Sequence, residues 1–110
     1  MVMLAELKCW RWLPGMLTED GWRLDCPSDG EWEATSSLAH RSYHKPASGP
    51  RLTDPATQGA IVFGILAPLG WAMALARIQQ GETLFMHRQH GFTEWLPLPE
   101  AIEAALRLEG

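Results

Sequence analysis

The residues of this chain that are best suited to metal binding are its four histidines, which occur as two close pairs. His40 and His44 are four residues apart, and His87 and His90 are three apart. Either spacing brings two imidazoles to one side of a helix, where they can share a metal ion. However, the first pair runs into a Lys-Pro dipeptide that disfavours a helix, and on a strand the second pair would point to opposite faces. We therefore expect no metal site.

The two cysteines, Cys9 and Cys26, are the candidates for a thiol nucleophile. A reactive thiol needs surroundings that stabilise the thiolate, together with an oriented base. Cys26 instead lies among acidic residues, which disfavour the thiolate, and Cys9 beside Lys8 belongs to no recognisable motif. The glycine-rich phosphate-binding patterns GxGxxG and GxxxxGK[ST] do not occur in the sequence. We therefore predict a protein that is not an enzyme and uses no cofactor.

Acidic residues are concentrated in one segment of a chain whose net charge is −4. Residues 19–33 contain six acids against the single base Arg23. Such a patch can steer a protein partner or imitate the charge of a nucleic acid, and the alternative is an ordinary solvated hairpin. We predict that the patch is the surface that binds a protein partner. It consists of Glu19, Asp20, Asp25, Asp29, Glu31 and Glu33.

A shorter basic segment supports a second hypothesis, in which the chain is a small nucleic-acid-contacting module. Residues 41–51 carry three bases and no acid. The negative charge of the whole chain argues against this hypothesis, because nucleic-acid binding needs a surplus of lysine and arginine. A protein is therefore the leading partner and nucleic acid the alternative. The contacts would come from Arg41, Tyr43, Lys45 and Arg51, beside His40 and His44.

The elements that must position these charges begin with a β-hairpin over residues 21–36. Pro27-Ser28-Asp29-Gly30 is typical of a tight turn. The segments on both sides alternate apolar and polar residues, as half-buried strands do. Residues 37–53 are polar and show little periodicity, so we expect a long loop or arm there.

The uncharged run over residues 59–76 has the composition of a membrane span, but it contains the helix-breaking residues Pro68 and Gly70, which argue against one. Asp54 and Pro55 are typical of a capped helix start. A helix over 55–67 would be about 20 Å long, well short of the roughly 30 Å core of a bilayer. Pro68 then interrupts the helix. We expect a buried helix, a sharp turn and a new element, in a protein without membrane association.

The second half of the chain predicts a further hairpin and a closing helix. Strands over 71–79 and 82–89 would be joined by a tight turn, although the alanine, methionine and leucine of the first segment leave a helix there as the alternative. Residues 97–108 form an amphipathic pattern that begins at two prolines. The expected fold is a single α+β domain over residues 1–110. The N-terminus has no secretory pattern, so we expect a cytoplasmic protein.

Three segments resemble small uncharacterised proteins encoded by phages and prophages of high-GC bacteria. They are RWLPGM at 11–16, LTDPATQG at 52–59 and EAIEAAL at 100–106. The resemblance implies a phage-type origin, a bacterial host cell, and strands before the C-terminal helix, but no activity. We therefore expect a phage accessory protein that acts by binding another protein. Inhibition of a host defence system, as anti-CRISPR proteins do, is one specific form of this function.

Overall fold

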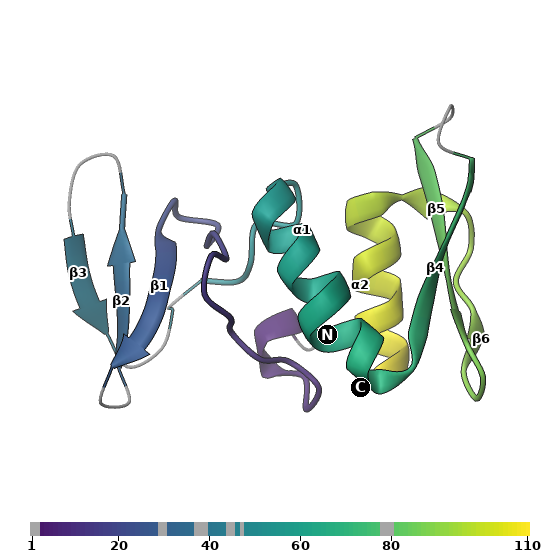
Figure 1. Ribbon diagram of the computed structural model, residues 1–110, viewed down its shortest axis with the longest axis horizontal. Coiled ribbons are helices and arrows are strands. Elements are labelled where there is room, and N and C mark those ends of the chain that lie inside the picture. The colour runs from purple at the N-terminus through teal and green to yellow at the C-terminus, as the bar shows by residue number, and fades with distance from the viewer. Residues whose placement is uncertain (1–2, 29–30, 37–39, 44–45, 47, 78–80) are drawn as a thin grey trace.

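The computed structural model places two antiparallel sheets at opposite ends of the molecule, with the helices between them (Figure 1). It describes residues 3–28, 31–36, 40–43, 46, 48–77 and 81–110. The predicted α+β architecture is confirmed. In chain order the elements are η1 (Leu4–Glu6), β1 (Arg23–Ser28), β2 (Glu31–Thr35), β3 (His40–Tyr43), α1 (Pro55–Ile61), η2 (Val62–Leu66), η3 (Ala67–Leu69), β4 (Trp71–Arg77), β5 (Glu82–His87), β6 (Gly91–Phe92), β7 (Leu96–Pro97) and α2 (Leu98–Glu109).

The first sheet has the strand order β1-β2-β3 and contains the predicted N-terminal hairpin. Leu24 on β1 pairs with Ala34 on β2, and both side chains are buried. Because side chains alternate along a strand, Glu33, next to Ala34, falls on the opposite, outward face of the sheet. Asp25 lies where the register between the strands shifts, between Leu24 and Pro27, and its side chain is exposed. The last two residues of the predicted turn, 29 and 30, lie outside the described residues.

The third strand of this sheet corrects the prediction of a long loop or arm over 37–53. His40–Tyr43 pair with β2 in an antiparallel register, with Ser42 opposite Glu33. The prediction is wrong for these residues because an edge strand needs backbone hydrogen bonds to one neighbour and no alternation of apolar side chains. The end of the segment is also anchored, since the backbone N–H of Arg51 donates to Leu17 O at 2.9 Å.

The central helix begins where the sequence predicts. Asp54 accepts a hydrogen bond from the backbone N–H of Thr57 at 3.0 Å, and Pro55 occupies the first turn, where no N–H is needed. The helical path then widens into the π-helical turn η2 and tightens into the 3-10 turn η3, which contains Pro68. It ends at Gly70, whose φ of +99° is a left-handed conformation that glycine adopts readily.

The uncharged run over 59–76 is therefore divided between this helical unit and β4. None of the described helices combines the length and the apolar composition that crossing a bilayer requires.

The second sheet contains the predicted second hairpin. β4 and β5 pair in an antiparallel register, which confirms a strand rather than a helix as far as the described residues extend. Residues 78–80, at the end of the first predicted strand and in the turn, lie outside them. β5 also pairs with the two-residue strands β6 and β7, which the sequence did not reveal. The predicted C-terminal helix is confirmed as α2, which packs against β5 and α1.

The core lies between α1 with η2, α2, and the inner face of the second sheet. α2 presents four buried residues to it at helical spacing, as the amphipathic pattern predicts. Trp10 and Trp71 join this core, and Trp12, Trp22 and Trp32 pack partly buried against it. The largest fully buried apolar side chains are Phe85, Met16, Leu24, Ile61, Ile65, Leu66, Ile102 and Leu106.

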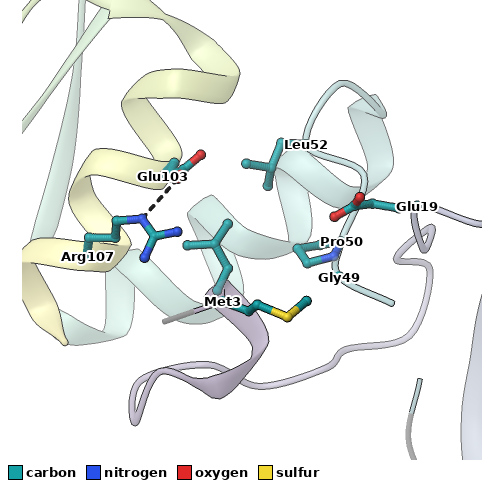
Figure 2. Close-up of a pocket in the computed structure, with 8 residues that line it drawn as sticks. Met3, Glu19, Gly49, Pro50, Leu52, Glu103 and Arg107 are labelled. Atoms are coloured by element: carbon teal, nitrogen blue, oxygen red, sulfur yellow. Dashed lines mark hydrogen bonds and ion pairs between the residues drawn. The ribbon is translucent and has the colours of Figure 1, made fainter. Parts of the chain in front are cut away.

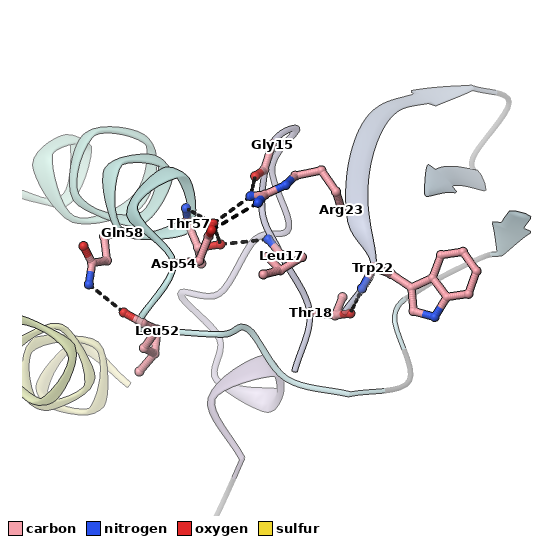
Figure 3. A network of polar contacts seen from close by, with 9 residues as sticks. All are labelled: Gly15, Leu17, Thr18, Trp22, Arg23, Leu52, Asp54, Thr57 and Gln58. Carbon is pink, nitrogen blue, oxygen red and sulfur yellow. Dashed lines mark hydrogen bonds and ion pairs between the residues drawn. The ribbon is translucent and has the colours of Figure 1, made fainter. Parts of the chain in front are cut away.

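A polar network fastens the first sheet and the N-terminal segment to α1 (Figure 3). Arg23 donates to both carboxylate oxygens of Asp54, at 2.7 and 3.1 Å, and to Gly15 O at 2.9 Å. The Thr57 hydroxyl donates to Asp54 at 2.8 Å and accepts from the backbone N–H of Leu17 at 2.7 Å. The hydrogen bond from Arg23 is the main reason that the pKa of Asp54 is lowered to about 2.

Candidate functional site

Two histidines and a glutamate converge where the end of α2 meets the turn after β5. His87 is the last residue of β5, His90 ends the turn that leads to β6, and Glu109 is the last residue of α2. One ring nitrogen of each histidine and one carboxylate oxygen of Glu109 lie within 4.8 Å of one another. Among the described residues, this is the one group of three such side chains that could hold a metal ion. We call it the histidine cluster.

The hydrogen bonds of His87 fix which ring nitrogen carries the proton. Its Nδ1 accepts from the backbone N–H groups of Gln89 at 3.0 Å and His90 at 3.2 Å, so Nδ1 holds the lone pair. Its Nε2 therefore carries the proton and donates to Leu69 O at 2.8 Å. His87 thus ties the end of η3 to the turn after β5.

His90 and Glu109 are held together over the face of Trp71. His90 Nε2 lies 3.3 Å from Glu109 Oε2, and the same oxygen accepts a hydrogen bond from Trp71 Nε1 at 3.1 Å. The ring of His90 is stacked on that of Trp71, with 5.8 Å between centroids and 3° between planes. The ring of His87 is tilted against Trp71 at 5.0 Å. The buried indole of Trp71 therefore packs against both imidazole rings.

The expectation that His87 and His90 point to opposite faces is therefore wrong. β5 ends at His87, and the turn that follows carries His90 back beside it, with 4.6 Å between the two ring centroids. The sequence argument places both histidines on a strand, whereas β5 ends at His87. Of the first histidine pair, His40 lies on β3 and His44 lies outside the described residues.

An open cleft of about 450 Å³ lies beside the histidine cluster. His87 and Glu109 both face it, so the cluster is accessible to a small ion or molecule. The described residues that line the cleft are Leu69, Gly70, His87, Arg88, Gln89 and Glu109.

The predicted acidic patch is divided between a turn and the outward face of the first sheet. Glu19 and Asp20 lie in the turn before β1, where Asp20 Oδ1 accepts hydrogen bonds from Thr18 and from Ser48 Oγ, the latter at 2.7 Å. Asp20 thus takes part in holding the fold together. Asp25 on β1 is exposed and Glu33 on β2 is half-buried.

The two remaining acids of the patch are Asp29 and Glu31. Glu31 is described by its backbone alone, as the first residue of β2, and Asp29 lies outside the described residues.

The alternative nucleic-acid contact is similarly divided. Arg51 donates from Nη2 to the backbone oxygen of Glu19 at 2.7 Å, so it links two loops of the fold. Arg41 and Tyr43 lie on β3, where they pair with Ala34 and Trp32 of β2. Lys45 lies outside the described residues.

The thiol of Cys9 is poorly suited to nucleophilic chemistry. Its Sγ donates to Leu106 O at 3.6 Å, and partial burial is the main cause that raises its pKa. A raised pKa keeps the thiol protonated near neutral pH, whereas a reactive cysteine needs the thiolate. Cys26 is described by its backbone alone, within β1.

A second cavity, of about 230 Å³, lies between η1, residues 49–52 and α2 (Figure 2). Glu19 stands on one side of it, and Arg107 and Glu103 form an ion pair of 2.9 Å on the other. This pair joins residues four apart on α2 and is partly exposed, so it stabilises the helix by a few tenths of a kcal/mol. Met3 and Leu52 line the space between. The polar groups do not converge on a common point, so we assign this cavity no chemistry.

No protein-family model, no curated protein and no solved structure matches this chain. What the chain does must therefore be argued from its own residues.

Proposed function

We propose that this chain is a non-enzymatic phage accessory protein that acts by binding another protein. Its contact surface is the outward face of the β1-β2-β3 sheet. The observation that carries the proposal is the position of this sheet. It lies at one end of the molecule, away from α2 and the second sheet (Figure 1), and it buries one face at Leu24 and Ala34 while the other carries acids.

The charge of the outward face favours a basic partner surface. Asp25 lies on β1 and Glu33 on the adjacent strand β2. Acids on adjacent strands repel one another, so an opposite charge placed over them is favourable. Arg23, at the start of β1, forms an ion pair with Asp54 on α1. A nucleic-acid-binding protein, whose surface is rich in lysine and arginine, has the complementary charge.

The finer form of the proposal is inhibition of a host defence system, as anti-CRISPR proteins do. It rests on the phage-like segments of the sequence and on the acidic face, which would occupy the nucleic-acid site of the target. Under this mechanism the partner cannot hold the chain and its nucleic acid at the same time. Binding should therefore weaken steeply with salt and with added DNA or RNA.

Charge reversal on the outward face tests the proposal. Asp25→Lys with Glu33→Lys should abolish capture of the partner from lysate of a bacterial host, because two attractions become repulsions. The matched control is Glu94→Lys with Glu100→Lys, which makes the same change of net charge at two exposed acids in the other half of the chain. Near-ultraviolet circular dichroism of both variants checks that they are folded.

The functional arm uses a bacterium with an active CRISPR–Cas system, challenged with a phage that this system targets. The chain and its control variant should restore plaques, and the outward-face variant should not. Equal capture by all three proteins would show that the acids are ordinary solvated charge. Capture that depends on the acids but without any effect on plaques would keep protein binding and reject the anti-CRISPR form.

A further inference from the structure

We propose that the histidine cluster is a binding site for a divalent transition-metal ion, with Zn²⁺ as the best match. Its ligands are His87, His90 and Glu109. This site lies between the second sheet and the end of α2, away from the first sheet (Figure 1). It does not depend on the proposed function.

The separation of two ligand atoms already fits a metal ion. Zinc binds imidazole nitrogen and carboxylate oxygen at about 2.0–2.2 Å, and tetrahedral angles then place two ligand atoms about 3.3–3.5 Å apart. His90 Nε2 and Glu109 Oε2 are 3.3 Å apart. The ligand atom of His87 is within 4.8 Å of both.

The tautomer of His87 has the form that metal-bound histidines use. Such a histidine gives its lone pair to the metal and donates its other ring N–H to a carbonyl or carboxylate, which orients the ring. His87 holds its lone pair on Nδ1 and donates from Nε2 to Leu69 O at 2.8 Å. A metal ion at Nδ1 replaces the hydrogen bonds from the backbone N–H groups of Gln89 and His90. The site therefore exists in a closed, hydrogen-bonded form that a metal has to open.

The charge around Glu109 also favours a cation. The last turn of a helix exposes carbonyl oxygens and carries a partial negative charge, so a carboxylate there is unfavourable until a cation joins it. Glu109 is the last residue of α2. Trp71 Nε1–H donates to its Oε2 and orients the carboxylate, as outer-shell donors do in metal sites.

The ligand set selects the kind of ion. Two imidazoles and one carboxylate suit Zn²⁺, Co²⁺, Ni²⁺ or Cu²⁺, whereas Mg²⁺ and Ca²⁺ prefer oxygen ligands. Three protein ligands leave at least one coordination position, and the cleft beside His87 and Glu109 gives access to it. Water or an anionic group of a ligand would fill that position.

Titration with Co²⁺ and Zn²⁺ alone tests the site. Binding is followed by calorimetry and by the visible absorption of Co²⁺, which reports nitrogen and oxygen ligands in tetrahedral geometry. The variants are His90→Gln and Glu109→Gln. Glutamine in place of Glu109 can still accept from Trp71, so the fold is disturbed little. Since loss of an outer-shell partner alone lowers metal affinity about 10- to 100-fold, removal of a ligand should lower it at least about 100-fold.

The matched control is His40→Gln, which removes a histidine of β3 and should leave the affinity unchanged. Zn²⁺ should also raise the Tm of the unaltered chain and not that of the two ligand variants, and Mg²⁺ should not change the Tm of any of them. The proposal is overturned if neither ion binds up to about 1 mM metal. It is also overturned if His90→Gln and Glu109→Gln bind as the unaltered chain does, or if an ultraviolet thiolate-to-cobalt band shows that the cysteines hold the ion.

Discussion

Replacing Asp54 by asparagine tests whether the charge of this carboxylate stabilises the joint between the first sheet and α1. Asparagine can still cap the helix by accepting from Thr57 N–H, but it cannot form an ion pair with Arg23. The pKa of Asp54 is about 2, against an ordinary value of 3.8. At about 1.4 kcal/mol per pKa unit, this difference corresponds to roughly 2 kcal/mol of stability.

Solvent reduces this magnitude. The side chain of Asp54 is 11% exposed, but that of Arg23 is 41% exposed, so water screens one side of the ion pair. We therefore expect Asp54→Asn to lower the free energy of unfolding by about 1–2 kcal/mol near neutral pH.

The pH dependence separates the charge from the cap. Because the folded-state pKa of Asp54 lies below its unfolded-state value, the stabilisation is complete above about pH 5 and is lost as the pH falls towards about 2. Urea denaturation of the unaltered and Asp54→Asn chains over this range measures the difference in free energy of unfolding. We expect that difference to be largest at neutral pH and close to zero near pH 2.

The control for this experiment is Asp25→Asn, which removes an exposed carboxylate on β1 and should change the free energy of unfolding by less than about 0.5 kcal/mol. If Asp54→Asn lowers the free energy of unfolding by the same amount at every pH, the loss comes from a poorer fit of the amide at the helix cap. That result would refute the argument from the ion pair. If it costs nothing at neutral pH, the contact with Arg23 contributes no net stability.

Two pairs of substitutions test the other supports of the fold, each by urea denaturation. Gly70→Ala should lower the free energy of unfolding by about 1–2 kcal/mol, because φ is +99° and the new Cβ would lie 3.1 Å from His87 Nε2. Gly59→Ala, inside α1 and with open space around it, should raise that energy by about 0.5–1 kcal/mol; an equal loss at both glycines would contradict the argument. Phe85→Ala should cost about 3–5 kcal/mol, because this side chain is fully buried in the core. Phe92→Ala, at a residue that is 69% exposed, should cost less than about 0.5 kcal/mol, and a larger loss would mean that this face of the sheet is covered.

The elements that the sequence predicted correctly are those with local signals. Asp54 and Pro55 fix the start of α1 whatever packs against it, since a capping carboxylate and a proline act within one turn. The end of the helical path differs from the prediction, because Pro68 lies inside the 3-10 turn η3 and the path continues to the left-handed Gly70. The apolar stripe of α2 predicts the helix and its buried face without any knowledge of which element packs against it.

The features that the sequence did not reveal depend on partners far away along the chain. β3 has no periodic pattern of its own and exists because β2 offers backbone groups to its residues. The histidine cluster needs β5 to end at His87 and α2 to bring Glu109 beside the turn, and neither is visible in the spacing of two histidines. The sequence predicts a strand over 82–89, whereas β5 ends at His87, two residues earlier. Strand ends are set by pairing partners as much as by local propensity, so a difference of this size is common.

The two proposed sites are independent because each is built from contacts within its own end of the molecule. The outward acidic face is carried by β1 and β2, whose opposite face packs at Leu24 and Ala34. The histidine cluster is carried by the turn after β5 and the end of α2, with Trp71 beneath it. A metal ion would therefore stabilise the second sheet against α2 without altering the charge of the surface proposed to bind a partner. The failure of either proposal leaves the other to be judged on its own experiment.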